Sequence, residues 1–456
     1  MTDPATSEPS FGRIRRPADN SKRAPVWPIR TVDIELSLEL PSLSQNMSGL
    51  ERTRVLVRLH DQAVGLVDLP PLDGVGEPRV YAPVIWAALR ERIGNHFSGD
   101  DMPAPTYLGA GGFPVSVQPR CRAETDLFRR EAPFASVIIA TRDRPAKLRT
   151  TLQCLRRLRY GAFEVVVVDN APTSSATREL VATLQSVDDR FRYVREDRPG
   201  TAWARNRGAE VARSDYLAFT DDDVLIDQDW LTRMIQAFAV REDVACVTGL
   251  ILAAELETQP QLWIEQFGGY SKGFDRRVFN LRSEPSPDPF FPYAAGKFGS
   301  GASMAFRRAA LSEFGGFDPA LGGGTPALGG EDIAAFLAIL LRGHDLVYEP
   351  AAIVWHFHHR RYGDLRRQIY AYGVGLSAHI AKVVVEDPRR LVELASLARS
   401  GIGYLLKPAS PKNRRKAANY PDELSRLELA GILYGPVAYL RGRLLARRMR
   451  RMPRAN

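Results

Sequence analysis

Three consecutive aspartates, Asp221, Asp222 and Asp223, follow the apolar stretch YLAFT (216–220). In extended backbone the first and third carboxylates project to the same side. Two neighbouring carboxylates repel each other unless a cation or water lies between them, and hard divalent cations such as Mg²⁺ and Mn²⁺ take oxygen ligands. The triplet therefore predicts either a divalent-metal site or a solvated acidic turn.

A second set of chemically capable residues lies further along the chain. Glu331 and Asp332 follow a glycine-rich loop and open a predicted helix, where the helix dipole favours acidic residues. A glycine-rich loop beside two acids is also what a closing substrate site requires. A short apolar strand then ends at His356, with His358 two residues later. Because the two histidines alternate near a predicted metal site, both are candidate ligands.

Strands and helices are predicted to alternate from Phe134 onward. Short apolar runs rich in β-branched residues are typical of buried strands, and they occupy 136–140, 163–169, 191–194, 215–220 and 244–249. Among the helices between them, one should begin at Pro145 with Asp143 as its cap, and another should run from a cap at Thr201 to Arg213. This alternation predicts an α/β fold class, a mostly parallel sheet covered on both faces by helices.

The ends of these strands predict where a ligand would bind. Ligands of such sheets bind beyond the carboxyl ends of the strands. Thr141, Asp169 and the aspartate triplet all lie at the carboxyl ends of predicted strands. We therefore expect them to share one rim of the sheet, although they are far apart in the chain.

Four regions are expected from composition and pattern: a disordered N-terminus (1–30), a small α/β module (31–130), the sheet domain (131–360) and a helical, basic C-terminal region (361–456). In the module, two paired strands should meet at Asp61-Gln62, and a helix should cover 83–97. No catalytic chemistry is evident there. The last region holds 20 Lys/Arg against 7 Asp/Glu, or +13, so the first 360 residues carry 9 − 13 = −4.

Composition also bears on the compartment. The three cysteines, Cys121, Cys154 and Cys246, are far apart and form no CxxC pair, so neither a disulfide framework nor a structural zinc site is expected. The N-terminus has no apolar leader, and no run of about 18 apolar residues occurs. We therefore expect a cytoplasmic protein that could lie peripherally on the cytoplasmic membrane face.

Seven motifs within 134–360 resemble family 2 glycosyltransferases of the GT-A fold. They are VIIATRDRP (137–145), VVVVDN (165–170), GTAWARNRG (200–208), FTDDD (219–223), GSGASMAFRR (299–308), GGED (329–332) and VWH (354–356). Each motif is weak alone, but seven in the family's order are specific for the family, although not for a substrate. The resemblance implies a nucleotide-diphospho-sugar donor and, as acceptor, a glycan, a lipid-linked molecule or a small molecule.

The resemblance implies a donor pocket at the rim. It places Thr141, Arg144, Asp169 and Asp222 at the nucleotide, Arg205 and Asn206 close to it, and Gly299, Ser300 and Gly301 along the donor sugar. Structural alternatives stay open. Asp169 could simply be a strand-end turn residue, Arg205 could pair with phosphate or brace Asp221, and the glycines could form a tight turn.

The resemblance also implies a metal site and a catalytic base. Asp223 would be the direct ligand of Mn²⁺ or Mg²⁺, Asp221 would contact the ribose or a metal-bound water, and His356 would complete the site. Asp332 would take the proton of the acceptor hydroxyl, with Glu331 orienting a sugar or acceptor hydroxyl. The implied activity is inverting hexosyl transfer. A nucleotidyltransferase and a non-catalytic nucleotide-sugar-binding module are the alternatives.

The C-terminal end combines apolar and basic residues. An apolar segment over 427–440, interrupted by Gly435-Pro436, precedes seven arginines in the last 16 residues. A basic amphipathic end can lie on an anionic membrane surface. That interpretation is favoured over an arm for nucleic acid, so no nucleic-acid partner is expected, and simple solvated helices stay as an alternative.

Overall fold

The computed structural model describes residues 28–43, 52–70, 76–283, 288–407 and 409–451. The predicted disordered N-terminus therefore lies outside the described residues, except for its last three. Of these, Ile29 and Arg30 already belong to the first strand, so the predicted boundary at residue 30 is slightly too late.

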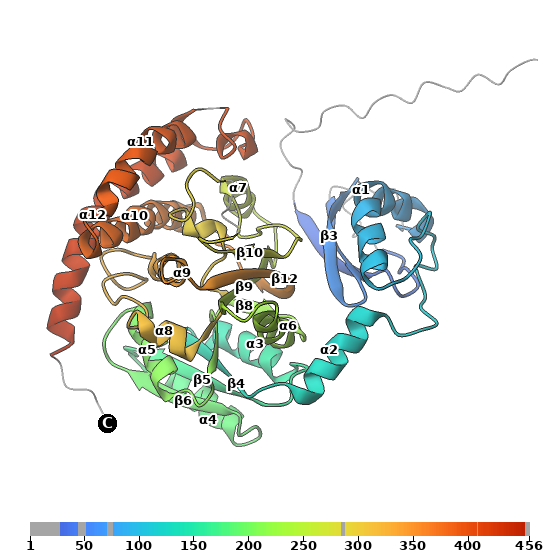
Figure 1. The fold of residues 1–456 in the computed structure, drawn as a ribbon, viewed down its shortest axis with the longest axis horizontal. Helices are drawn as coiled ribbons and strands as arrows, with labels where there is room; N and C mark the ends of the chain where they lie inside the picture. The colour runs from blue at the N-terminus through green and yellow to red at the C-terminus, as the bar shows by residue number, and fades with distance from the viewer. Residues whose placement is uncertain (1–27, 44–51, 71–75, 284–287, 408, 452–456) are drawn as a thin grey trace, which may run out of the picture.

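The N-terminal module is a three-stranded sheet with helices beside it. β2 (Arg52–Leu59) and β3 (Gln62–Leu69) form the predicted hairpin, and β1 (Ile29–Glu35) pairs in parallel with β2. Helix α1 (Pro78–Gly99) begins earlier than predicted because Pro78 occupies its first turn, and Pro83 lies inside the helix. Helix α2 (Arg120–Glu131) leads from this module into the large sheet (Figure 1).

The central sheet has nine strands, in the order β10-β12-β9-β11-β7-β4-β5-β6, with β8 paired to β12. Six strands run in one direction, and β8, β10 and β11 run against them. The prediction of a mostly parallel sheet is thus confirmed. The strands are β4 (Ala135–Thr141), β5 (Phe163–Asn170), β6 (Phe191–Glu196), β7 (Tyr216–Thr220), β8 (Val224–Ile226), β9 (Val244–Ala253), β10 (Arg277–Phe279), β11 (Ser303–Arg307) and β12 (Asp345–His356).

Helices cover both faces of this sheet. Successive valines of β5 enter two different apolar cores, with Val165 and Val167 in one and Val166 and Val168 in the other. This explains why the strand is apolar throughout rather than alternating. The covering helices include α3 (Pro145–Arg156), α4 (Ala176–Gln185), α5 (Thr201–Val211), α6 (Trp230–Gln236), α8 (Arg308–Glu313) and α9 (Glu331–Leu341), whereas α7 (Gln259–Phe267) packs against the first helix of the C-terminal region.

Two predicted helix caps are wrong. Arg144, not Asp143, is the N-cap residue of α3, and the Asp143 carboxylate instead accepts a hydrogen bond from the backbone N–H of Thr173. Helix α5 is capped by Gly200, with Thr201 as its first residue and Val211 as its last. Neither side chain caps its helix, because each contacts a distant segment instead: Asp143 contacts Thr173, and Thr201 Oγ1 donates to the carbonyl oxygen of Gly323.

Three long helices make up the C-terminal region: α10 (Tyr362–Glu386), α11 (Arg390–Leu406) and α12 (Asp422–Met449) (Figure 1). Helix α12 packs closely on α10 through glycines, since a Cβ on Gly431 would lie 2.3 Å from the carbonyl oxygen of Tyr370. Gly435-Pro436 does not interrupt α12, contrary to prediction. Within the described residues, none of the helices combines the length and apolarity that crossing a membrane requires.

Candidate active site

Strand pairing brings the aspartate triplet to His356. The short strand β8 follows Asp223 directly and pairs antiparallel with the end of β12, so that Val224 lies opposite His356. The Nε2 atom of His356 lies 3.5 Å from Oδ1 of Asp223. One ligand atom from each of Asp221, Asp223 and His356 lies within 4.8 Å of the other two. The three residues that the sequence assigned to a metal therefore meet at one point.

Burial sets the protonation of this cluster. It lowers the pKa of His356 to about 4, so the imidazole is neutral near pH 7 and a nitrogen lone pair is available. Burial raises the pKa of Asp221 to about 6, against the opposing effect of Arg205. Two carboxylates and a neutral imidazole suit Mn²⁺ or another first-row cation better than Mg²⁺. The residues present thus fit a divalent metal.

Asp222 points away from this cluster, toward the first strand of the sheet. Its carboxylate accepts a hydrogen bond of 2.6 Å from Thr141 Oγ1 and lies 3.3 Å from the guanidinium of Arg144. Lys147 Nζ lies 3.1 Å from the Asp223 carboxylate. The sequence analysis missed Lys147. Its place in the first turn of a helix that starts at the rim is the signal that could have identified it.

The shared rim is confirmed by strand register. Thr141 and Asp169 are direct partners in the parallel pair of β4 and β5. Asp169 is fully buried and accepts a hydrogen bond of 3.0 Å from Tyr193 Oη, and burial raises the pKa of its carboxyl group. Through the Thr141 hydrogen bond to Asp222, this end of the rim connects to the aspartate triplet.

Arg205 joins the metal cluster to the two acids of α9. Its buried guanidinium lies 3.1 Å from Asp221 Oδ1 and 3.0 Å from Glu331 Oε1, and it donates to the carbonyl oxygen of Gly301. Of the two roles left open for Arg205, bracing Asp221 is the one seen. Burial raises the pKa of Glu331 to about 7, although Arg205 opposes that shift. Asn206, unlike Arg205, makes no hydrogen bond to these acids in the part of the chain that the structure describes. Its side-chain Nδ2 donates a hydrogen bond to the carbonyl oxygen of Phe317, and its Oδ1 accepts one from the Phe317 N–H.

The glycines before β11 allow close packing at the site. A Cβ on Gly301 would lie 2.7 Å from the Arg205 guanidinium, and one on Gly299 would lie 2.4 Å from the side chain of Thr248. The backbone N–H of Gly301 donates to Asp332 Oδ2 at 2.7 Å, which fixes that carboxylate. The structural alternative, a tight backbone turn before β11, is the one seen, and the contact of these residues with a donor sugar stays a prediction.

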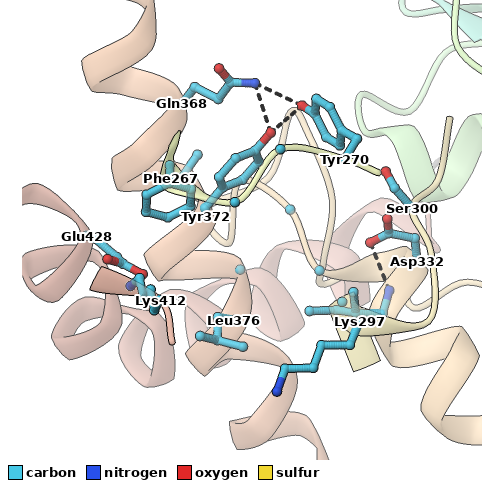
Figure 2. A pocket seen from close by; sticks show the side chains of 18 of the residues that line it. Phe267, Tyr270, Lys297, Ser300, Asp332, Gln368, Tyr372, Leu376, Lys412 and Glu428 are labelled. Carbon is cyan, nitrogen blue, oxygen red and sulfur yellow. Dashed lines mark hydrogen bonds and ion pairs between the residues drawn. The ribbon is translucent and has the colours of Figure 1, made fainter. Parts of the chain in front are cut away.

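A cavity of about 2130 Å³ opens at this cluster, lined by Asp221, Ser300, Glu331 and Asp332. Figure 2 shows Asp332 near Ser300 and a hydrogen-bonded trio of Tyr270, Gln368 and Tyr372. The trio was not found from the sequence, because its members come from a loop and from α10. The Tyr270 ring lies 5.1 Å from the His356 ring, between centroids. It therefore forms a wall beside the metal cluster.

His358 does not belong to the metal cluster. Its buried ring lies 2.9 Å from the carboxylate of Glu265 through Nε2. Glu265 lies on α7, so the contact fixes that helix to the end of β12. The pairing of His356 and His358 as ligands, expected from their alternation, is therefore wrong in this structure.

Comparison with known proteins tests the resemblance of the sheet domain to family 2 glycosyltransferases. Residues 136–315 match the family model described as glycosyl transferase family 2. Glucosyl-dolichyl phosphate glucuronosyltransferase of Haloferax volcanii is 23% identical over 185 residues, 40% of this chain and 55% of that protein. Pre-mycofactocin glycosyltransferase of Mycobacterium tuberculosis is 25% identical over 246 residues, 54% of this chain and 47% of that protein. The chain thus spans about half the length of these relatives.

Among solved structures, a mannosyltransferase from Pyrobaculum calidifontis in complex with GDP-Man and Mn²⁺ has a TM-score of 0.41. It is 18% identical, over 73% of this chain and 84% of that chain. The family match itself contains Thr141, Asp169 and the aspartate triplet. The segment therefore belongs to glycosyl transferase family 2. Asp332 and His356 lie beyond the matched residues, and only the fold brings them to it.

Proposed function

We propose that this protein transfers a hexosyl group from a nucleotide-diphospho-sugar to an acceptor hydroxyl, with a divalent metal and with inversion at the anomeric carbon. Residues 131–360 would form the catalytic domain, of GT-A type. One observation carries the proposal: Arg205 links Asp221 of the metal cluster to Glu331, beside Asp332, at the edge of one large cavity. A metal that would stabilise the diphosphate leaving group and a carboxylate that would deprotonate the acceptor hydroxyl would therefore lie at the same cavity.

The donor half of the site would lie along the strand rim. A divalent metal held by Asp221, Asp223 and His356 would supply positive charge to the diphosphate leaving group. Thr141, Arg144, Asp169 and Asp222 would position the nucleotide, and Lys147 adds a second cation near the phosphates. The small residues Gly299, Ser300 and Gly301 leave room for the donor sugar. Asn206 would position the loop at Phe317, because its side-chain amide forms hydrogen bonds with the backbone of that residue.

The acceptor half would begin at Asp332. Its Oδ2 is held by the Gly301 N–H, and it lines the cavity, so the carboxylate can accept a proton from a hydroxyl that enters there. Attack from the side opposite the diphosphate inverts the anomeric centre. Glu331 would stay in its pairing with Arg205 and keep Asp332 in place. The cavity continues along α10, α11 and the segment after α11, where Arg399, Lys407 and Arg415 favour an acceptor that bears an acidic group.

A membrane surface is the proposed location of that acceptor. Leu433, Val437, Leu440 and Leu444 lie three or four residues apart on one face of α12, and all four are exposed. Exposed arginines follow at the end of the same helix, namely Arg441, Arg447, Arg448, Arg450 and Arg451. An apolar stripe beside arginines suits the surface of an anionic bilayer, and a lipid-linked acceptor would be met there.

A sugar-nucleotide panel tests the proposal. Purified protein would be incubated with each donor, with a set of candidate hydroxyl acceptors, and with Mn²⁺, Mg²⁺ or EDTA, and nucleoside diphosphate release would be measured. We expect release from one donor with Mn²⁺ and none with EDTA, and NMR of the product should show an inverted anomeric centre. Pyrophosphate release from a nucleoside triphosphate and a sugar 1-phosphate, supplied in place of the donor, would instead indicate a nucleotidyltransferase. Donor binding by calorimetry without turnover, across the acceptors offered, would indicate a non-catalytic module.

A further inference from the structure

Four side chains of different chemical type converge in the N-terminal module, far from the aspartate triplet in the sequence. His60 follows β2, His96 and Asp100 lie at the end of α1, and Cys121 lies in the first turn of α2. One ligand atom from each lies within 4.8 Å of all the others. The motif analysis gave no role to any of them.

The four ligand atoms are arranged around a common point. His60 Nδ1 lies 2.6 Å from Asp100 Oδ2 and 3.1 Å from His96 Nε2. Cys121 Sγ lies 3.1 Å from the same carboxylate oxygen and 3.7 Å from His96 Nε2. Ligands of a tetrahedral zinc ion, at about 2.0–2.3 Å from the metal, are separated by roughly 3–4 Å. Three of these separations fall within that range, and the 2.6 Å between His60 Nδ1 and Asp100 Oδ2 lies below it.

Three side chains share one carboxylate oxygen in this arrangement. His60 and His96 direct ring nitrogens at each other and at one carboxylate oxygen, which already faces the Cys121 thiol. A hydrogen bond between the two rings requires one of these nitrogens to carry a proton and the other to offer a lone pair, whereas a bound cation would take the lone pairs of both. The second ring nitrogen of fully buried His60 makes no hydrogen bond to the described residues. The polar contacts of that ring are therefore all on the side of the cluster.

The backbone around the cluster is held in place. His60 adopts a positive φ of 54° in the hairpin turn, and Asp61 one of 66°. Such turns favour Asn and Gly, so a buried histidine there requires a compensating contact. The Glu35 carboxylate accepts the backbone N–H groups of His60 and Asp61. Asp100 Oδ1 accepts the backbone N–H of Cys121 at 2.8 Å, which leaves Oδ2 directed at the cluster.

We propose that His60, His96, Asp100 and Cys121 bind a structural zinc ion. Two imidazoles, a carboxylate and a thiolate fill all four positions of a tetrahedral site, which is typical of structural rather than catalytic zinc. The site would fix the start of α2 to the hairpin and to α1. Helix α2 in turn contacts α6 beside the central sheet, through Thr125 with Arg233 and Arg129 with Asp229. The zinc would thus hold the module in register with the catalytic sheet.

Metal analysis of the purified full-length chain tests this site independently of glycosyl transfer. After mild EDTA dialysis, elemental analysis should find about one zinc ion per chain, because closed structural sites release the metal slowly. Asp223→Asn should keep that zinc, which separates this site from the aspartate cluster. In Cys121→Ser and in His96→Gln, the zinc content per chain should be at least tenfold lower than in wild type. Cys154→Ser is the matched control and should keep it.

Cobalt substitution provides a second measurement on unmutated protein. Co²⁺ bound by this set should give a thiolate-to-metal charge-transfer band in the near ultraviolet and visible bands of tetrahedral cobalt. Wild-type protein that retains no zinc and shows no thiolate band with Co²⁺ would overturn the proposal, even if a variant fails to fold. Equal zinc in wild type, Cys121→Ser and His96→Gln would overturn it as well.

Discussion

His356 Nε2 lies 3.5 Å from Asp223 Oδ1. The two residues meet because His356, at the end of β12, pairs with Val224 of β8, the residue that follows Asp223. Replacing His356 with Gln should raise the Mn²⁺ concentration needed for half-maximal activity by about tenfold or more, since even groups that merely orient metal ligands contribute roughly that much. A Mn²⁺ titration of transfer activity measures this. His358→Gln is the matched control, because that ring bonds Glu265 instead. Equal Mn²⁺ requirements in both variants would remove His356 from the metal site.

Asp332 carries the proposed proton transfer. Asp332→Asn keeps an oxygen for the Gly301 N–H but loses the base, so kcat should fall by about 10²–10⁴. Donor affinity measured by calorimetry should stay within a few-fold of wild type, because the metal cluster is untouched. Near-normal turnover of the variant would assign the proton to another group.

His379 should make stability depend on pH. It is fully buried on α10, and burial lowers its pKa from 6.5 to about 4. Between those values the unfolded chain binds more protons than the folded chain, so the free energy of unfolding rises with pH. The loss from pH 7 to pH 4 is on the order of 2–3 kcal/mol from this residue.

Denaturant unfolding at pH 5 and pH 7.5 checks this dependence. His379→Gln should show a smaller difference between the two pH values than wild type does. Effects of net charge are shared by both proteins, so the difference isolates His379. An identical difference in both proteins would show that the ring is protonated in the folded state as readily as in the unfolded one.

The packing of α12 on α10 should tolerate no side chain at Gly431. A Cβ there would lie 2.3 Å from the Tyr370 carbonyl oxygen, a backbone atom that cannot move alone. Gly431→Ala should destabilise the protein by about 1–3 kcal/mol, measured by chemical unfolding. Gly363→Ala near the start of α10 is the control, because its Cβ meets nothing within 4 Å. The Gly363 variant should be neutral or slightly more stable.

The exposed stripe of α12 should bind anionic membranes. Leu433 is 81% exposed and Leu440 is 52% exposed. The double variant Leu433→Ser/Leu440→Ser should reduce co-sedimentation with phosphatidylserine-containing liposomes several-fold. Leu127→Ser on α2, at 55% exposure, is the control and should bind as wild type does. Recovery of wild-type protein in the supernatant at low salt would exclude the membrane proposal.

The sequence determined the order of elements and the identity of the rim residues. Strands and helices follow from local apolar periodicity, and parallel strands place Thr141, Asp169 and the triplet at the same edge. The helix caps predicted at Asp143 and Thr201 are wrong, since both side chains bond to segments that lie far away in the sequence.

Only the tertiary structure decided which polar residues meet. His356 reaches Asp223 and His358 reaches Glu265, although the two histidines alternate in one short segment. The sequence left open whether Arg205 faces phosphate or carboxylate, and the fold places its guanidinium between Asp221 and Glu331. The cluster of His60, His96, Asp100 and Cys121 has no local signature, because its members come from three separate elements. Periodicity records which face of an element is buried, whereas the partners of a buried polar group depend on how distant elements pack.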